Sequence, residues 1–244
     1  MDKTTGLLST LDYPGRLIAM GLAYAGARAV IVYAITGRSP SSQARKLVLR
    51  DRGIWVQPTD EDVLKTGNVD LLVYPALLFG QGGVAVSNGK QTADIRDSLA
   101  SGAGPIGVLS RALAAWDFEP DTPIFTPRIS GCLVHGAAGL SLVRRGESGE
   151  TLRSYFEVPL REGEGRLVST YMGPNRDPLP SFAGEPRRVE LAGGSARETA
   201  ETVYRELGPV LPEKDFRVAV ACVSASLPRP DDLEVHIVNR HGRT

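Results

Sequence analysis

The chain has 244 residues, of which 42% are hydrophobic and 23% charged, a composition typical of soluble globular proteins with a sizeable core. Lysine and arginine together number 28, as do aspartate and glutamate, so the formal net charge is +0. This balance argues against a general nucleic-acid or anionic-membrane surface, but it does not exclude a local basic pocket. No apolar run approaches the roughly 18 residues of a membrane span, and the first five residues lack the apolar region of a signal peptide, so we expect a cytoplasmic protein.

Cysteines and histidines are few and scattered along the chain. Cys132 and Cys222 lie far apart and fit no metal-ligand spacing, and we interpret them as buried thiols rather than a disulfide. His135, His236 and His241 form no ligand pattern either. The sequence therefore predicts no metal site, and we expect no cofactor.

Strand-like runs dominate the first part of the chain, over residues 16–23, 29–35, 70–74 and 83–87. Gly26 is expected in the turn of a hairpin formed by the first two runs, and residues 80–83 in the turn between the last two.

Two helices are predicted next, over residues 94–99 and 105–115, with a break at residues 102–105 that puts Pro105 near the start of the second helix. Spacings of three or four residues predict one core-facing stripe made of Ile106, Leu109, Leu113 and Trp116.

The second half repeats the strand signal, over residues 128–134, 139–143, 152–158, 167–172, 218–223 and 233–238. Residues 173–180 are a loop by composition, and Ser195 is placed to cap a helix together with Glu198. Several hairpins with a few long helices indicate one layered α/β domain over residues 1–244, with antiparallel sheets covered by helices. No GxGxxG that follows a predicted strand, and no GxxxxGK[ST], marks a parallel nucleotide-binding fold in the sequence.

A polar loop, residues 37–45, follows the apolar run 29–35 and contains two arginines and three serines. An arginine fork binds phosphate through two hydrogen bonds and stays charged at any accessible pH, and serine hydroxyls add short donors. The loop therefore predicts a phosphate cradle made of Arg38, Ser39, Ser41, Ser42 and Arg45. The alternative is a solvated turn whose serines cap a helix that begins near Gln43.

Three other polar positions have an ordinary interpretation beside a functional one. Asn88-Gly89 is the commonest dipeptide of a two-residue hairpin turn, which is its simpler interpretation. Glu119 follows a predicted helix, where the negative helix end disfavours a carboxylate. Arg128 would compensate it, although an exposed loop acid is the commoner explanation. For Arg128 the alternative is a cation at a sheet edge that reaches solvent.

Five short segments occur in an order that resembles one protein family. They are Tyr13-Pro14-Gly15-Arg16, Gly37-Arg38-Ser39 with Arg45, Asn88-Gly89 with Thr92 and Asp94, Asp117-Phe118-Glu119, and Thr126-Pro127-Arg128-Ile129 with Gly131. No single segment is diagnostic, but together they resemble the archaeal-type IMP cyclohydrolase family, including its bacterial relatives. The resemblance covers the chain up to about residue 135, and the remainder is compatible only in its strand–helix–strand rhythm.

This resemblance implies a fold and a reaction. The fold would be a four-layer αββα sandwich of mainly antiparallel sheets, similar to the N-terminal-nucleophile hydrolases but without their self-processing. The reaction would close the purine ring of 5-formamidoimidazole-4-carboxamide ribonucleotide (FAICAR), which releases water and IMP in purine biosynthesis. The matching pocket positions would be Arg38, Tyr74 and Glu119.

Roles follow from this expected chemistry. Glu119 would transfer protons, Tyr74 would transfer a proton or orient the substrate, and Arg38 and Lys90 would polarise it. The candidates for the ribose 5′-phosphate are Arg16, Ser41, Ser42, Arg45 and Arg128. The other substrate-binding candidates are Ser39, Asn88, Thr92 and Asp94.

The chain also departs from the family pattern. Lys90 stands where a small polar residue is expected, Pro120 follows Glu119 where a lysine is usual, and the loop of residues 37–45 is longer than the archaeal pattern. These changes border the expected pocket, so one alternative is a related cyclisation or the binding of another ribonucleotide. A second is a non-catalytic nucleotide-binding protein. A third is an amidase with an N-terminal nucleophile at Thr4 or Thr5. The sequence leaves open whether the chain forms a homo-oligomer.

Overall fold

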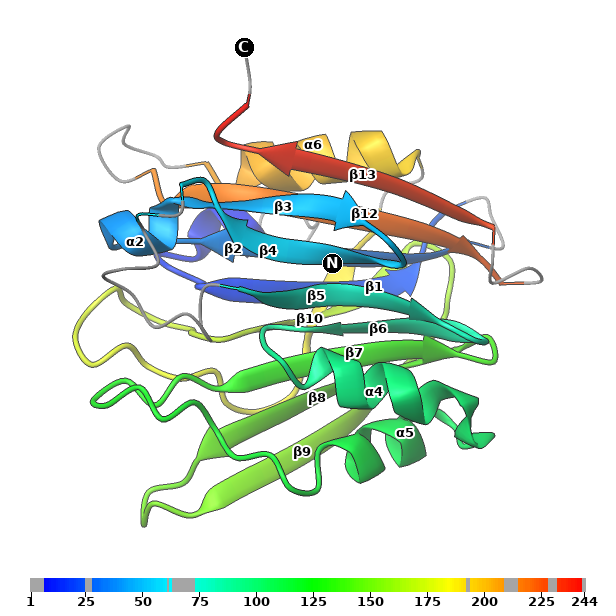
Figure 1. Ribbon diagram of the computed structural model, residues 1–244, viewed down its shortest axis with the longest axis horizontal. Coiled ribbons are helices and arrows are strands. Elements are labelled where there is room, and N and C mark those ends of the chain that lie inside the picture. The colour runs from blue at the N-terminus through cyan, green and yellow to red at the C-terminus, as the bar shows by residue number, and fades with distance from the viewer. Residues whose placement is uncertain are drawn as a thin grey trace.

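The computed structural model describes residues 7–24, 28–60, 62, 73–191, 194–208, 215–227 and 232–242. Two antiparallel sheets pack face to face, and helices cover the outer face of each sheet (Figure 1). The layers therefore follow the order helix, sheet, sheet, helix, as expected for a four-layer α/β sandwich. The likeness to N-terminal-nucleophile hydrolases stays a prediction.

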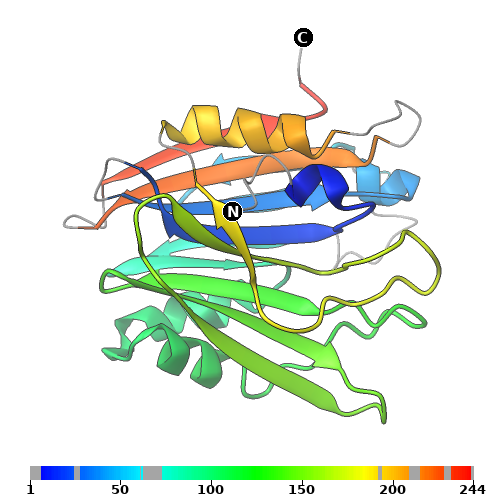
Figure 2. The same cartoon turned by 180° about the vertical axis from the view of Figure 1, so that it is seen from behind.

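The first sheet has six strands in the order β11-β10-β1-β2-β12-β13. Their bounds are β1 Arg16–Leu22, β2 Arg28–Thr36, β10 Glu164–Ser169, β11 Arg187–Glu190, β12 Arg217–Ser226 and β13 Leu233–Asn239. Helix α6, Ala196–Glu206, begins at the predicted cap, where Ser195 and Glu198 form a reciprocal capping box. Figure 2 shows this helix lying over β12 and β13 on the outer face.

The second sheet has seven strands in the order β3-β4-β5-β6-β7-β8-β9. Their bounds are β3 Arg45–Arg50, β4 Gly53–Pro58, β5 Tyr74–Gly80, β6 Gly83–Ser87, β7 Arg128–Val134, β8 Ala137–Arg145 and β9 Thr151–Val158. Its outer face is covered by α4, Thr92–Ser98, and α5, Pro105–Ala112. Three shorter helical segments are η1 Leu8–Thr10, α2 Pro40–Gln43 and η3 Leu99–Ser101. No helix in the described part of the chain has both the length and the apolar character that a membrane span requires.

The two-residue period of the strands divides the core into layers. In β2, Ile31, Tyr33 and Ile35 belong to the core between the sheets, whereas Val30 and Val32 belong to the core beneath α6. This alternation explains why the central strands read as continuous apolar runs, because both of their faces are buried.

Most predicted strands are confirmed, and the differences have local causes. The strands β3, β4 and β11 were not predicted. For β3 the reason is its place at a sheet edge, where charged and exposed residues interrupt the apolar pattern. The expected strand over 70–74 has its residues 70–72 outside the described residues, and β5 begins at Tyr74, where that prediction ended. The strand expected over 167–172 ends at Ser169.

Both predicted helices of this region are present with shifted bounds, and α4 begins at Thr92 instead of residue 94. Pro105 is the first residue of α5, as expected, but the helix ends at Ala112 instead of residue 115. Within the predicted stripe, Leu109 and Leu113 are fully buried, whereas Ile106 is only half-buried and Val108 joins the core. Gly26 lies outside the described residues.

Candidate active site

Two tyrosines from opposite sheets meet between the layers. Tyr33 of β2 and Tyr74 at the start of β5 have their hydroxyl oxygens 2.8 Å apart, and their residues are 0% and 1% exposed. The guanidinium groups of Arg16, the first residue of β1, and Arg45, the first residue of β3, interact electrostatically with both phenols. We call Arg16, Tyr33, Arg45 and Tyr74 the phenol–arginine cluster.

The strand period puts these side chains on the inner faces. In the β1–β2 register Ile18 lies opposite Tyr33, and both belong to the core between the sheets. Arg16 is two residues before Ile18, so its side chain leaves the same face of β1. The cluster therefore lies where the inter-sheet core meets the beginnings of β1, β3 and β5.

Among the described residues, neither arginine of this cluster has an anionic partner. Arg45 donates to the backbone oxygens of Ser42 at 2.8 Å and Thr36 at 3.3 Å, and the buried Nε of Arg16 finds no acceptor among those residues. Within the described residues, no carboxylate forms an ion pair with either guanidinium.

The electrostatics of the cluster favour an anion. Burial lowers the pKa of Arg45, Tyr74 opposes this, and the charge of Arg16 adds to it. For Arg16, burial also disfavours the charge, but the phenols led by Tyr74 hold its pKa above the ordinary range. Two neighbouring cations withdrawn from water without a counter-charge are costly, and a bound anion would relieve that cost.

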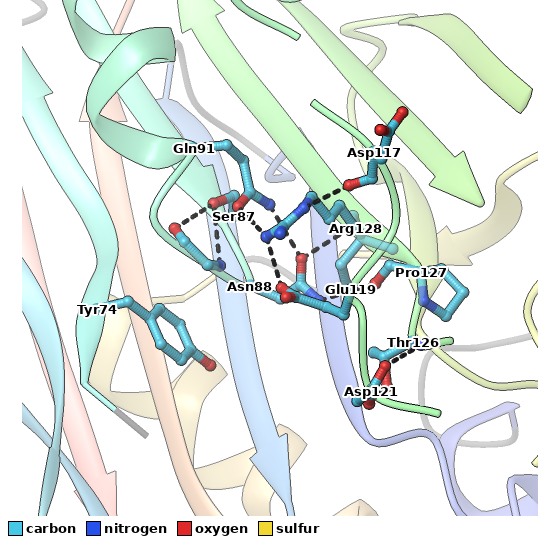
Figure 3. Close-up of polar contacts among 12 residues, drawn as sticks. Tyr74, Ser87, Asn88, Gln91, Asp117, Glu119, Asp121, Thr126, Pro127 and Arg128 are labelled. Atoms are coloured by element: carbon cyan, nitrogen blue, oxygen red, sulfur yellow. Dashed lines mark hydrogen bonds and ion pairs between the residues drawn. The ribbon is translucent and has the colours of Figure 1, made fainter. Parts of the chain in front are cut away.

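A second polar group forms around Arg128, the first residue of β7. Its Nη1 donates to Glu119 Oε1 at 2.5 Å and to Gln91 Oε1 at 3.1 Å, and its Nε donates to the carbonyl of Asp117 at 2.6 Å. The guanidinium also lies 4.7 Å from the ring centroid of Trp116. Figure 3 shows these contacts converging on Arg128. We call Gln91, Glu119 and Arg128 the acid–arginine cluster.

Both ordinary interpretations of this pair were wrong. Glu119 is 4% exposed and Arg128 is 8% exposed, so neither an exposed loop acid nor a solvent-reaching edge cation is present. The reason is topological, because β7 is an interior strand flanked by β6 and β8, and the preceding segment folds back so that the N–H of Glu119 donates to the carbonyl of Thr126. Burial lowers the pKa of Arg128, and Glu119 opposes that shift.

Asn88-Gly89 does not form a hairpin turn, which corrects the simpler interpretation. It connects β6 to α4, and the Asn88 side chain is buried. Its Oδ1 accepts from the backbone N–H of Ile129 at 2.9 Å, and its Nδ2 donates to the carbonyl of Pro127 at 2.9 Å (Figure 3). Asn88 therefore fixes the connection against the beginning of β7.

Gly89 is required by close approach to the ion pair. A Cβ atom at this position would lie 2.5 Å from Gln91 Oε1, 2.9 Å from Arg128 Nη1 and 3.2 Å from Glu119 Oε1. A side chain at this position would displace these groups, so glycine allows the backbone to cover the acid–arginine cluster.

The loop of residues 37–45 contains the helix cap that was the alternative to a phosphate cradle. Ser39 accepts from the N–H of Ser42 and Ser42 from the N–H of Ser39, a capping box for α2, which begins at Pro40 rather than near Gln43. The hydroxyl oxygens of Ser39 and Ser41 are 3.2 Å apart.

The two arginines of that loop have different surroundings. Arg38 donates to Asn175 Oδ1 at 3.0 Å and to Asp177 Oδ1 at 2.8 Å, and its guanidinium lies 5.3 Å from the ring centroid of Tyr13. Arg45, in contrast, is 2% exposed and belongs to the phenol–arginine cluster. The structure therefore brings Arg45 together with Arg16 and Tyr74, whereas Arg38 pairs with the loop of residues 173–180.

Three other candidates lie around the β6–α4 connection. Thr92 is buried and donates to the carbonyl of Gly89 at 2.8 Å. Asp94 is exposed and accepts from the indole N–H of Trp116 at 2.7 Å. Lys90 is exposed. Thr92 thus supports the backbone of the connection, and the Trp116 ring links Asp94 to Arg128.

Sequence reasoning missed Tyr33 and Tyr171. Tyr33 lies inside an apolar run, where a tyrosine is normally interpreted as a core residue without a functional role. The hydroxyl of Tyr171 lies 2.5 Å from that of Thr126, which in turn lies 2.5 Å from Asp121 Oδ2, and the Tyr171 ring stacks on Tyr13. The position of Thr126 beside Arg128 in one quoted segment is the signal that pointed to this region.

The two clusters act on each other. The charge of Arg16 contributes to the lowered pKa of Arg128, after burial and against Glu119. Together they bring a carboxylate, a phenol pair and cations without a carboxylate partner into one region, which suits proton transfer on an anionic substrate. The described residues contain no group of three or more His, Cys, Asp and Glu side chains that could hold a metal ion.

Comparisons with known proteins show similarity to IMP cyclohydrolases. The model of a family described as IMP cyclohydrolase-like protein matches residues 13–226. An IMP cyclohydrolase of Methanothrix thermoacetophila is 27% identical over 228 residues, which cover 93% of this chain and 98% of the relative. An IMP cyclohydrolase of Halobacterium salinarum strain R1 is 33% identical over 133 residues, or 54% of this chain and 63% of the relative.

Proposed function

The chain belongs to the IMP cyclohydrolase-like family, and we propose that it is an IMP cyclohydrolase that closes the ring of FAICAR in purine biosynthesis. The observation that carries the proposal is the buried Glu119–Arg128 pair, electrostatically coupled to Arg16 of the phenol–arginine cluster. The names of the archaeal relatives support the same activity. Such a role fits one domain over residues 1–244 in the cytoplasm.

The reaction requires two proton movements. The carboxamide nitrogen attacks the formyl carbon, a C–N bond forms, and one proton passes from that nitrogen to the formyl oxygen. The resulting hydroxyl then leaves as water after it gains a second proton, while the formamide nitrogen loses its proton and forms a double bond to the same carbon. Both steps are intramolecular for the substrate, so positioning and proton transfer are the contributions left to the protein.

Glu119 is the proposed proton acceptor of the attack. Its carboxylate is held by Arg128 and sits away from water, where a fixed acceptor costs no reorganisation during the reaction. Tyr74 is the proposed donor to the leaving hydroxyl. Arg38 and Lys90 retain the proposed role of polarising the substrate from more exposed positions, Arg38 beside the loop of residues 173–180 and Lys90 in the connection that Asn88 and Thr92 support.

The ribose 5′-phosphate is assigned to Arg16 and Arg45. Both guanidiniums lack a carboxylate partner within the described residues, so a phosphate would supply the missing negative charge. Arg128 is the weaker candidate for this role because Glu119 already neutralises it. The hydroxyls of Ser39, Ser41 and Ser42 remain proposed secondary contacts, since Ser39 and Ser42 also cap α2.

Incubation of the purified chain with FAICAR tests the proposal. Formation of IMP, followed by its absorbance and identified by chromatography, is expected, and Glu119→Gln should abolish most of it. Lack of IMP despite tight IMP binding would favour the non-catalytic nucleotide-binding alternative. Turnover of another ribonucleotide would favour the alternative that Lys90 and Pro120 motivate. A mature chain that begins at Thr4 or Thr5 and hydrolyses amides would overturn the proposal in favour of an amidase.

A further inference from the structure

Tyr33 is a buried polar group without an obvious structural need. It lies in the middle of β2, within the apolar core between the sheets, where a phenylalanine would fill the same space. Its hydroxyl reaches across to the other sheet, and in the described part of the chain the Tyr74 hydroxyl is its hydrogen-bond partner. Because a buried hydroxyl needs a hydrogen-bond partner, the contact with Tyr74 is the reason we infer for a tyrosine at this position.

The proposed role of Tyr74 determines which phenol gives the hydrogen bond. The two hydroxyl oxygens are 2.8 Å apart, and either could donate. Burial raises the pKa of Tyr33 well above its ordinary value, and Tyr74 adds to that rise, so Tyr33 keeps its proton. Because Tyr74 is the proposed proton donor to the substrate, Tyr33 is the donor to Tyr74 Oη.

We infer that Tyr33 is a positioning residue of the proposed reaction, which orients the proton of Tyr74 toward the substrate and stabilises the Tyr74 oxygen once that proton has left. The inference rests on the proposed function. With Tyr33 as donor, one lone pair of Tyr74 Oη is occupied, and the Tyr74 hydrogen must point to another acceptor. The leaving hydroxyl of the cyclised intermediate would be that acceptor.

The step balances without any further reactant. Tyr74 gives its proton to the hydroxyl, the C–O bond breaks, and water leaves. The Tyr74 oxygen is then negative and accepts the Tyr33 hydrogen bond. The formamide nitrogen loses its proton as the C=N bond forms, and that proton returns to Tyr74. Because the hydrogen bond is stronger to the charged oxygen than to the neutral one, it lowers the barrier more than it stabilises the bound substrate.

A double-mutant cycle of Tyr33→Phe and Tyr74→Phe tests this inference. Tyr33→Phe should lower kcat for FAICAR by about 10- to 100-fold, the range for a hydrogen bond to a charged group, with KM within about twofold of the wild type. In the Tyr74→Phe background the same change should lower kcat no further. Tyr204→Phe is the matched control, because it removes the phenol hydroxyl of a buried residue of α6, outside the inter-sheet core, and should leave kcat unchanged.

The outcomes separate this inference from the proposed function. A wild-type chain without activity on FAICAR would overturn both. An active wild type with an equally active Tyr33→Phe would overturn the positioning role alone. Multiplicative losses in the double variant would also overturn it, since they indicate that Tyr33 acts independently of Tyr74. Melting temperatures of all four variants, with kinetics measured well below them, separate a loss of folding from a loss of catalysis.

Discussion

The carboxylate of Glu119 and the guanidinium of Arg128 lie 2.5 Å apart, and both are almost completely withdrawn from water. A pair of this kind contributes little to net stability relative to apolar residues, but breaking it is costly because one charge is left buried alone. The same pair in an enzyme presents a carboxylate whose position and charge are fixed. Stability and activity should therefore respond differently to its removal.

Arg128→Ala should lower the free energy of unfolding by about 3–5 kcal/mol, because Glu119 loses its counter-charge inside the protein. The double variant Glu119→Leu with Arg128→Met should recover much of that loss and still be inactive. Denaturant unfolding and FAICAR turnover measure the two effects. The control is Arg197→Ala on α6, whose partner Glu201 is exposed, and which should cost about 0–0.5 kcal/mol. Equal losses for both arginines would contradict the buried-pair argument.

Gly89→Ala should damage the same cluster through the backbone. The new methyl group would overlap Gln91 Oε1 and Arg128 Nη1, so the connection or the ion pair must move. We expect a loss of roughly 1–3 kcal/mol in stability, as for overpacking, and a clear fall in kcat. Gly104→Ala is the matched control, since a Cβ there meets no atom within 4 Å. Unchanged kinetics in Gly89→Ala would mean that the backbone at this position does not determine the geometry of Glu119.

The sequence predicted the strands better than the site, and the reason is physical. Alternating apolar residues are a local pattern, so β1, β2 and β7 could be located without the fold. The burial of Arg128 depends on whether its strand is interior, which is decided by strands distant in the sequence. The loop of residues 37–45 looked like one unit, but its two arginines separate, because Arg45 already belongs to the edge strand β3.

Arg45→Met should reduce the preference of the chain for IMP over inosine. Arg45 is one of two guanidiniums without a carboxylate partner in the described residues, and a charge-assisted hydrogen bond contributes about 1.5–3 kcal/mol. IMP affinity should therefore fall by roughly 10- to 100-fold, while weak inosine binding stays the same. Calorimetry with both ligands measures this.

Ser39→Ala separates the cap from the phosphate site. It should lower stability by about 0.5–2 kcal/mol through loss of the α2 cap, and lower the ratio of IMP to inosine affinity far less than Arg45→Met does, because Ser39 is only a secondary contact. If Ser39→Ala weakened IMP as strongly as Arg45→Met, the phosphate would lie against the loop of residues 37–45 itself. Equal affinities of the wild type for IMP and inosine would exclude a phosphate site in both places.

Both thiols should be unreactive in the native protein. Cys132 and Cys222 are 0% exposed, and burial raises the pKa of each to about 12. Ellman's reagent at pH 8 should therefore label neither thiol in the folded chain and both in guanidinium chloride, since only the thiolate reacts. Labelling of the native chain at the rate of the unfolded chain would contradict this burial.

The same shifts make stability depend on alkaline pH. Above the ordinary thiol pKa of about 8.5, both cysteines ionise in the unfolded chain but stay protonated in the native one up to about 12, so the native state binds more protons. The free energy of unfolding should then fall as the pH rises, by up to about 1.4 kcal/mol per pH unit for each thiol. Other groups titrate in this range, so the comparison is with the variant Cys132→Ala, Cys222→Ala. Urea unfolding between pH 8.5 and 10 should show a shallower decline for the variant, because the thiol contribution is missing. Identical slopes would mean that the thiols have the same pKa in the folded and unfolded chain.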